Sequence, residues 1–207
     1  YIYNFKKEYM NPFANFPVMI AEYAIALGAP VYNLEKEKYI QWSSGDSHPF
    51  YFNSRKILSD PGARKVLTEA IVSLIDNRVA LDYVYGVPQA GIAPAILVCL
   101  KLNKPLLIKN GNKYFSININ IVKELVKDIL KDFTESIDII AGTTPLGIIF
   151  GITAAEQLNK KFLFVREQPK NYGLREQVEG IIERDARIFL MDPTCNHTKN
   201  YVLEAIR

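Results

Sequence analysis

The fold is decided by two stretches of sequence, DYVYGVPQAGIAPAILVCLKLNK at residues 82–104 and DIIAGTTPLGIIFGITAAEQLNK at residues 138–160. Each predicts a strand, a glycine-bearing turn, a helix and the approach to a further strand. The second stretch repeats identities of the first at a spacing of 56 positions: Asp82/Asp138, Gly86/Gly142, Gly91/Gly147, Ile92/Ile148, Leu102/Leu158, Asn103/Asn159 and Lys104/Lys160. We interpret this as an internal βαβ repeat over 82–109 and 138–165, the alternative being two ordinary βαβ units with similar turns.

Strands that alternate with helices continue to the end of the chain. This pattern predicts an α/β fold with a five-stranded, mainly parallel sheet flanked by helices. The turns that follow parallel strands lie at the carboxyl edge of the sheet, so we expect both glycine turns there. The expected strands are 82–86, 105–108, 137–141, 162–165 and 187–191.

The N-terminal part follows another pattern. Residues 18–28 have helical spacing and stop at Gly28, with Pro30 beyond it. Aromatic and polar residues at 37–57 surround a turn at 43–46, which predicts short antiparallel strands. We therefore expect a small N-terminal helix and an antiparallel hood over about 18–57, and a core over about 60–207. No low-complexity linker divides the chain, so 1–207 is expected to be a single domain.

Composition excludes several classes of protein. The chain has 207 residues, of which 49% are hydrophobic and 23% charged, as in soluble globular proteins. No apolar run approaches the roughly 18 residues of a membrane span. A net charge of +3 does not favour a nucleic-acid partner, although a local positive cluster could still bind a small anion. Two cysteines, Cys99 and Cys195, form no disulfide framework, which favours a cytoplasmic protein.

Two segments have the chemistry of a phosphate site. The turns from Gly86 to Gly91 and from Gly142 to Gly147 would present backbone N–H groups at helix N-termini, which suits phosphate or pyrophosphate. Neither turn has the Lys-Ser/Thr of a Walker loop, which disfavours ATP hydrolysis. The alternative is that both turns are tight connections. Arg166 and Lys170 lie in a polar stretch that is either a lid over an anionic substrate or a solvated loop.

Four motifs, and the order in which they follow one another along the chain, resemble those of orotate phosphoribosyltransferases. They are Ser47-His-Pro-Phe-Tyr-Phe-Asn53, Asp82-x-x-x-Gly-x-x-x-x-Gly-Ile92, Val165-Arg166-x-x-x-Lys170-x-x-Gly173 with Glu179-Gly180, and an apolar strand that ends at Asp192. The resemblance covers about residues 18–206. It implies a type I phosphoribosyltransferase fold, a homodimer and a Mg²⁺-assisted reaction. That reaction transfers ribose 5-phosphate from phosphoribosyl pyrophosphate (PRPP) to orotate in pyrimidine biosynthesis.

The resemblance also implies roles for individual residues. Lys170 matches the loop lysine that approaches pyrophosphate in the transition state, and Arg166 matches the arginine that opens this loop. Asp192 matches the first acid of the PRPP-binding strand, near the ribose hydroxyls. Lys170 and Asp192 are thus the implied catalytic residues. The implied substrate-binding residues are Arg166, Gly86, Gly91, Gly142, Gly147, Phe52, Asn53, Thr194 and Thr198. Mg²⁺ is implied by the resemblance alone, because no metal ligands are visible as a cluster.

The chain departs from the family pattern after Asp192. The family has a second acid there, followed by a Thr/Gly-rich turn that holds the 5-phosphate. This chain reads Asp192-Pro193-Thr194-Cys195-Asn196-His197-Thr198, in which Pro193 lacks an N–H and no glycine follows. Three hypotheses remain: an orotate phosphoribosyltransferase or close homologue, a catalytically impaired protein of this fold that binds a nucleotide or a partner chain, and a transferase for another base.

Overall fold

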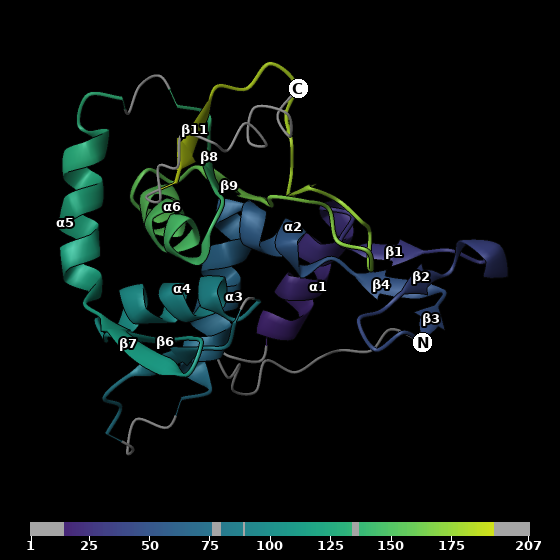
Figure 1. Cartoon of the computed structure of the whole chain (residues 1–207), viewed down its shortest axis with the longest axis horizontal. Coiled ribbons are helices and arrows are strands. Elements are labelled where there is room, and N and C mark those ends of the chain that lie inside the picture. Colours follow the sequence, from purple (N-terminus) through teal and green to yellow (C-terminus); the bar gives the residue numbers. More distant parts are fainter. Residues whose placement is uncertain (1–14, 76–79, 89, 134–136, 193–207) are drawn as a thin grey trace, which may run out of the picture.

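The computed structural model describes residues 15–75, 80–88, 90–133 and 137–192 (Figure 1). Helices and strands alternate through most of this part of the chain. The helices are α1 (Phe16–Ala26), η1 (Lys36–Lys38), α2 (Ser54–Ser59), α3 (Pro61–Ser73), α4 (Ile92–Leu102), α5 (Ile119–Leu130) and α6 (Pro145–Gln157). The strands are β1 (Pro30–Tyr32), β2 (Ile40–Gln41), β3 (Ser47–His48), β4 (Phe50–Phe52), β5 (Val84–Gly86), β6 (Leu106–Asn110), β7 (Lys113–Ile117), β8 (Ile139–Gly142), β9 (Lys161–Val165), β10 (Val178–Glu179) and β11 (Ile188–Met191).

The N-terminal helix and the antiparallel hood are as predicted. Strand β1 pairs with β4 and β2 pairs with β3, both antiparallel. Helix α1 packs on α3 through Ala24, which is buried with Ala63 and Ile57. Two short helices follow the hood: the Asn53 side chain caps α2 by accepting from Arg55 N–H, and Asp60 caps α3 by accepting from Ala63 N–H.

All five predicted strands form, but they lie in two sheets rather than one. Strands β5, β6 and β7 make one sheet, and β10, β9, β8 and β11 make another. The sequence analysis missed β7, which occupies the second edge of β6. The turn between them, Asn110-Gly111-Asn112, has Gly111 at φ +58°, as tight hairpin turns require. Strand β6 pairs with β5 and β7, whereas β8 pairs with β9 and β11 in the other sheet, so the prediction of a single five-stranded sheet is wrong.

The strand directions agree with the prediction. Strand β8 pairs in parallel with β9 and with β11, and β5 pairs in parallel with β6. The antiparallel additions, β7 and β10, lie at sheet edges. The fold is therefore α/β, with mainly parallel strands flanked by helices, as the sequence predicts.

The two sheets share one core. Helices α4 and α6 pack on each other, with α4 against β5 and β6 and α6 against β8 and β9, so this helix layer lies between the sheets (Figure 1). A single buried cluster includes Ile96 of α4, Leu106 of β6, Ile152 of α6 and Phe162 of β9. Ile140 and Phe164 of the second sheet are buried in this cluster as well, whereas Ile139 lies in a separate buried cluster with Leu163 and Val165.

The two glycine-turn units end alike. Asn103 after α4 and Asn159 after α6 adopt left-handed conformations, at φ 53° and 50°. Asparagine tolerates this conformation better than most residues, so the shared Leu-Asn-Lys ends each helix in the same way. Within the described residues, no helix is both long and apolar enough to cross a membrane. The helix expected over 201–206 lies outside the described part of the chain.

Candidate anion site beside β8 and β9

The predicted loop cations lie around one buried carboxylate. Arg166 follows β9 and donates to Glu179 Oε2 from Nε at 3.1 Å and from Nη2 at 2.8 Å. Lys170 Nζ lies 3.4 Å from Glu179 Oε1. Glu179 is held in place by β10, where it lies opposite Phe164 of β9. The structure thus brings Arg166 and Lys170 together at one carboxylate.

A third cation joins the cluster from α2. Arg55 Nε lies 3.6 Å from Glu179 Oε2, and the guanidinium Cζ is 3.8 Å from the centroid of the Phe164 ring. The residue is only 7% exposed. Its Nη1 atom is buried and has no hydrogen-bond partner. A buried donor without a partner costs free energy, so this atom is well placed to bind a ligand that supplies an acceptor.

Arg64 provides a comparison within the same chain. It is also buried, but all three of its guanidinium nitrogens donate hydrogen bonds. Nε donates to Glu156 at 2.7 Å, Nη1 to the carbonyls of Leu58 and Ser59, and Nη2 to the Lys160 carbonyl at 2.8 Å. Arg64 therefore links α3 to α6 and to the start of β9 as a structural residue. Arg55 differs because part of its guanidinium remains unpartnered.

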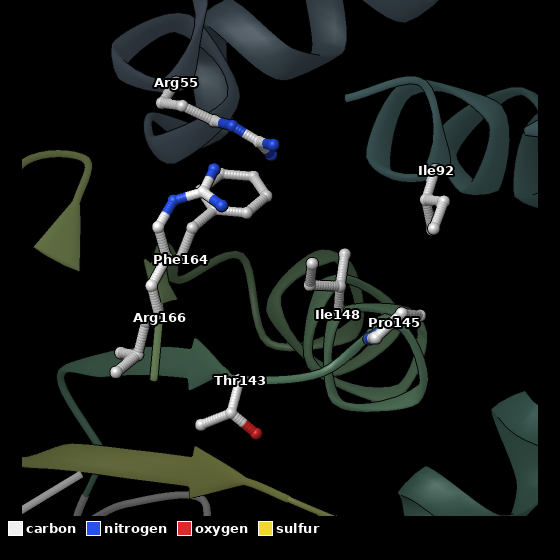
Figure 2. A pocket seen from close by; sticks show the side chains of 8 residues that line it. Arg55, Ile92, Thr143, Pro145, Ile148, Phe164 and Arg166 are labelled. Atoms are coloured by element: carbon white, nitrogen blue, oxygen red, sulfur yellow. The ribbon is translucent and has the colours of Figure 1, made fainter. Parts of the chain in front are cut away.

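Arg55 borders a small cavity at the carboxyl ends of β8 and β9. Its volume is about 40 Å³, and Arg166, Phe164 and the start of α6 also line it. Figure 2 shows the guanidinium groups of Arg55 and Arg166 close to the Phe164 ring. The hydroxyl of Thr143, the other buried polar atom without a partner among the described residues, points away from these guanidinium groups in this view. Thr143 nevertheless lines the same cavity as Arg55 and Arg166, so both buried polar groups without a partner in the described residues border it.

Burial changes the acid–base properties of the cluster. It lowers the pKa of Lys170, and the negative charge of Glu179 opposes this shift. It lowers the pKa of Arg55 as well, again against the effect of Glu179. Burial raises the pKa of Tyr51, whose neighbour Glu179 adds to the shift. A negative partner therefore keeps these buried cations charged, and a bound anion would act in the same sense.

The segment that carries Lys170 contacts the hood. The Gly173 N–H donates to the Gln41 carbonyl at 2.7 Å. Gly173 has φ +66°, and a Cβ at this position would contact the Tyr51 hydroxyl at 3.4 Å. Further along, the Ile181 N–H donates to Ser59 Oγ at 2.9 Å. The segment is therefore held to the hood at Gly173 and to α2 at Ile181, while residues 167–169 are exposed.

The predicted glycines have packing roles. A Cβ on Gly147 would lie 2.4 Å from the Met191 carbonyl, and one on Gly142 would lie 2.5 Å from the Gly147 carbonyl. A Cβ on Gly91 would lie 2.9 Å from backbone atoms of Val87, and Gly86 packs closely on Ile92. These contacts explain the glycines as close backbone packing between a strand and its helix. They support the tight-connection reading, and a ligand is not needed to explain them.

The two glycine turns nevertheless face a common cavity of about 620 Å³. Pro88 of the first turn and Pro145 of the second lie on its walls, together with side chains of β6 and β7. This volume is within the range of about 300–1,000 Å³ that is usual for small-molecule sites. The walls are mostly apolar, and Ile92 and Pro145 also line the small cavity beside Arg55. The two cavities are therefore neighbours.

The other predicted residues are separate from the cluster or undescribed. Phe52 is 43% exposed on the hood strand β4, and Asn53 caps α2. Asp192 directly follows β11. Thr194 and Thr198 lie outside the described residues. The described part of the chain contains no group of three or more His, Cys, Asp or Glu side chains that could hold a metal ion.

Sequence reasoning missed Arg55 and the role of Glu179. A signal for Arg55 was present, because a lone arginine in the buried α2 segment beside Ile57 and Leu58 needs a partner. Glu179 was part of a quoted motif, but its partners come from α2, from the end of β9 and from the following loop. Only the folded chain brings those segments together.

Comparison with known proteins finds orotate phosphoribosyltransferases among the sequence relatives. No protein-family model matches the chain. An orotate phosphoribosyltransferase of Streptococcus thermophilus is 32% identical over 173 residues, which are 84% of this chain and 56% of that protein. One of Dinoroseobacter shibae is 39% identical over 75 residues, or 35% of this chain and 33% of that protein. The chain therefore spans about half the length of the Streptococcus thermophilus relative.

Among solved structures, the orotate phosphoribosyltransferase of Aeropyrum pernix matches with a TM-score of 0.40 and 17% identity, over 72% of this chain and 80% of that one. A UMP synthase of Leishmania donovani matches with a TM-score of 0.41 and 14% identity, over 74% of this chain and 31% of that one. The sequence relatives, and not these structural likenesses, carry the family assignment.

Proposed function

This chain belongs to the orotate phosphoribosyltransferase family, and from that membership we propose that it transfers ribose 5-phosphate from PRPP to orotate. The observation that carries the proposal is the buried, unpartnered Nη1 of Arg55 beside Arg166 and Lys170. Such a cluster favours a ligand with several negative charges. PRPP is a ligand of this kind.

We assign the residues as follows. Arg55 and Arg166 would bind the pyrophosphate group, and Lys170 would neutralise the charge that develops on it as the bond to ribose breaks. Cations placed where negative charge develops lower the reaction barrier. Asp192, at the end of β11, would contact the ribose hydroxyls. The apolar cavity of about 620 Å³ next to the cluster has room for further parts of the substrate.

Mg²⁺ belongs to this proposal only as a companion of the substrate. It is commonly bound through substrate phosphates, water and one or two carboxylates. The described residues gather no cage of such donors. The roles proposed for Arg55, Arg166 and Lys170 need no metal ion held by this chain. By its family, we further propose that the protein acts in the cytoplasm as a homodimer.

The activity test combines a binding and a turnover measurement. PRPP binding is measured by calorimetry with Mg²⁺, and orotate consumption by absorbance, with other bases as alternative acceptors. Lys170→Ala should lower kcat by on the order of 10² while the circular dichroism spectrum stays unchanged. Lys113→Ala, on the exposed strand β7, is the matched control and should leave kcat unchanged. Unchanged turnover in Lys170→Ala would remove Lys170 from the mechanism.

The second candidate is a protein of this family that binds a phosphorylated ligand or a partner chain without transferring a group. It is favoured by the sequence after Asp192, where Pro193 replaces an acid and glycine is absent up to Thr198. The same assay separates the two candidates. PRPP binding without orotate consumption supports the second, whereas consumption of orotate supports the first.

A further inference from the structure

Glu179 is a negative group at the centre of a site for negative ligands. Both of its carboxylate oxygens are engaged: Oε2 by Arg166 at 2.8 Å and Arg55 at 3.6 Å, and Oε1 by Lys170 at 3.4 Å. The residue is 7% exposed, so solvent screens these interactions little. The cations that would bind a ligand are thus already partly neutralised by the protein itself.

The cavity beside the cluster is closed to a large ligand in this arrangement. Its volume of about 40 Å³ is far below the usual range of about 300–1,000 Å³ for small-molecule sites. An anion that binds Lys170 or Arg166 in this arrangement competes with Glu179 for them, whereas Nη1 of Arg55 is already without a partner. Lys170 and Arg166 are the more exposed of the three, with side chains at 22% and 18%, whereas that of Arg55 is 9% exposed and stacked on Phe164.

A ligand that takes Lys170 or Arg166 away from Glu179 loses the free energy of those ion pairs. A ligand with a single charge offers the cations little more than Glu179 already does. A diphosphate has several charges and more acceptor oxygens, so its interactions with the cations outweigh the loss of their ion pairs with Glu179. The competition therefore lowers the affinity for all anions and leaves only the multiply charged ones bound.

We propose that Glu179 is a specificity-determining residue, whose carboxylate competes with ligand anions for Lys170 and Arg166 and so restricts the site to diphosphate-bearing ligands. The proposal deepens the proposed function, on which it rests for the identity of the ligand. Glu179 itself need not touch the substrate. Its effect is exerted through the cations that it holds.

The test uses inorganic phosphate and inorganic pyrophosphate as probes, with calorimetry of the whole chain. The wild type should bind pyrophosphate and show negligible affinity for phosphate. Glu179→Gln keeps the size of the side chain and removes its charge, so it should bind phosphate roughly tenfold more tightly and pyrophosphate by a smaller factor, which narrows the preference for the diphosphate. The matched control is Glu183→Gln, which removes a carboxylate that pairs with Lys161 outside the cavity and should leave both affinities unchanged.

A gain of affinity separates this role from a structural one, because a merely damaged site would bind anions more weakly. Unchanged or weaker binding in folded Glu179→Gln overturns the proposal. If that variant does not fold, Glu179→Asp replaces it: the shorter side chain withdraws the carboxylate from Lys170 and should give a smaller gain in the same direction. No gain in Glu179→Asp then overturns the proposal.

A second readout is independent of ligand binding. Acylation of lysines, followed by mass spectrometry, should label Lys170 more slowly than the exposed Lys113 in the wild type and lose this protection in Glu179→Gln. Equal labelling of the two lysines in the wild type would overturn the proposal. A wild type without transferase activity but with the Glu179 effects would refute the proposed function alone. An active enzyme without these effects would refute only the role of Glu179.

Discussion

Asp138 directly precedes β8 and Arg187 directly precedes β11, and their side chains form an ion pair at the start of these two neighbouring strands. The Asp138 carboxylate accepts the Arg187 backbone N–H at 2.9 Å and two guanidinium N–H groups, from Nε at 2.8 Å and Nη2 at 2.9 Å. These hydrogen bonds from Arg187 lower the pKa of Asp138 well below its ordinary range. The charged form of Asp138 is therefore bound more strongly in the folded chain than in the unfolded one.

This pair predicts a pH dependence of stability. The pKa of Asp138 is lower in the folded chain than in the unfolded chain, where it is about 3.9. The ion pair therefore contributes its full stability above about pH 3.9 and loses it as the pH falls toward the pKa of the folded chain. Asp138→Asn keeps one acceptor but loses the charge, so it should lower the urea midpoint at pH 7. The difference in urea midpoint between Asp138→Asn and the wild type should become smaller below about pH 4. Urea titrations between pH 3 and 7 measure this, with Asp128→Asn on α5 as control. A difference that stays constant down to pH 3 would contradict it.

At the scale of single elements, the glycines of α6 and its turn fix how closely the helix approaches the sheet. A Cβ on Gly147 would meet the Met191 carbonyl at the end of β11, and one on Gly151 would meet the Phe162 ring at 2.6 Å. Both contacts are shorter than real Cβ atoms show, and backbone cannot yield as easily as a flexible side chain. The close approach of α6 to β9 and β11 thus depends on the absence of side chains.

Gly147→Ala tests this packing. Alanine usually stabilises a helix relative to glycine, but here the clash with Met191 should outweigh that gain and lower the free energy of unfolding by about 1–3 kcal/mol. Chemical denaturation measures the change. Leu146→Ala, at the neighbouring position where the side chain is 41% exposed, is the control and should have a much smaller effect. A stabilised Gly147→Ala would show that the turn relaxes freely.

At the scale of the whole molecule, two sheets depend on one helix layer. Ile96 of α4 and Ile152 of α6 are both fully buried in the cluster that joins the β5–β7 sheet to the β8–β11 sheet. Neither sheet is buried by the other, because α4 and α6 separate them (Figure 1). The two glycine-turn units should therefore unfold together and not as independent bodies.

Ile152→Ala tests this coupling. Removal of a fully buried isoleucine should cost about 2–5 kcal/mol. Trp42, the single tryptophan, lies in the hood, whereas far-ultraviolet circular dichroism reports on all helices. Fluorescence and circular dichroism should shift to the same lower urea midpoint. Ile121→Ala, which is 60% exposed on α5, should change it little. Separate transitions for the two probes would contradict a single cooperative core.

The sequence alone determined the local structure and the chemistry of the loop. Apolar strands that alternate with helices after glycine-bearing turns are encoded by nearby residues, so β5, α4, β8 and β9 were predictable. The same holds for the cations Arg166 and Lys170. The turn at Asn110-Gly111-Asn112 was also readable, and with it the missed strand β7, which pairs with β6.

Tertiary structure alone decided the number of sheets and the centre of the site. The strands with which a given strand pairs can lie far away in the sequence. The local pattern of apolar and polar residues predicts a strand but not its partners. In the same way, Arg55 and Glu179 are 124 positions apart in the sequence, yet Arg55 Nε lies 3.6 Å from Glu179 Oε2. Burial and charge give these residues their properties, and both arise only when α2, β9 and β10 pack together.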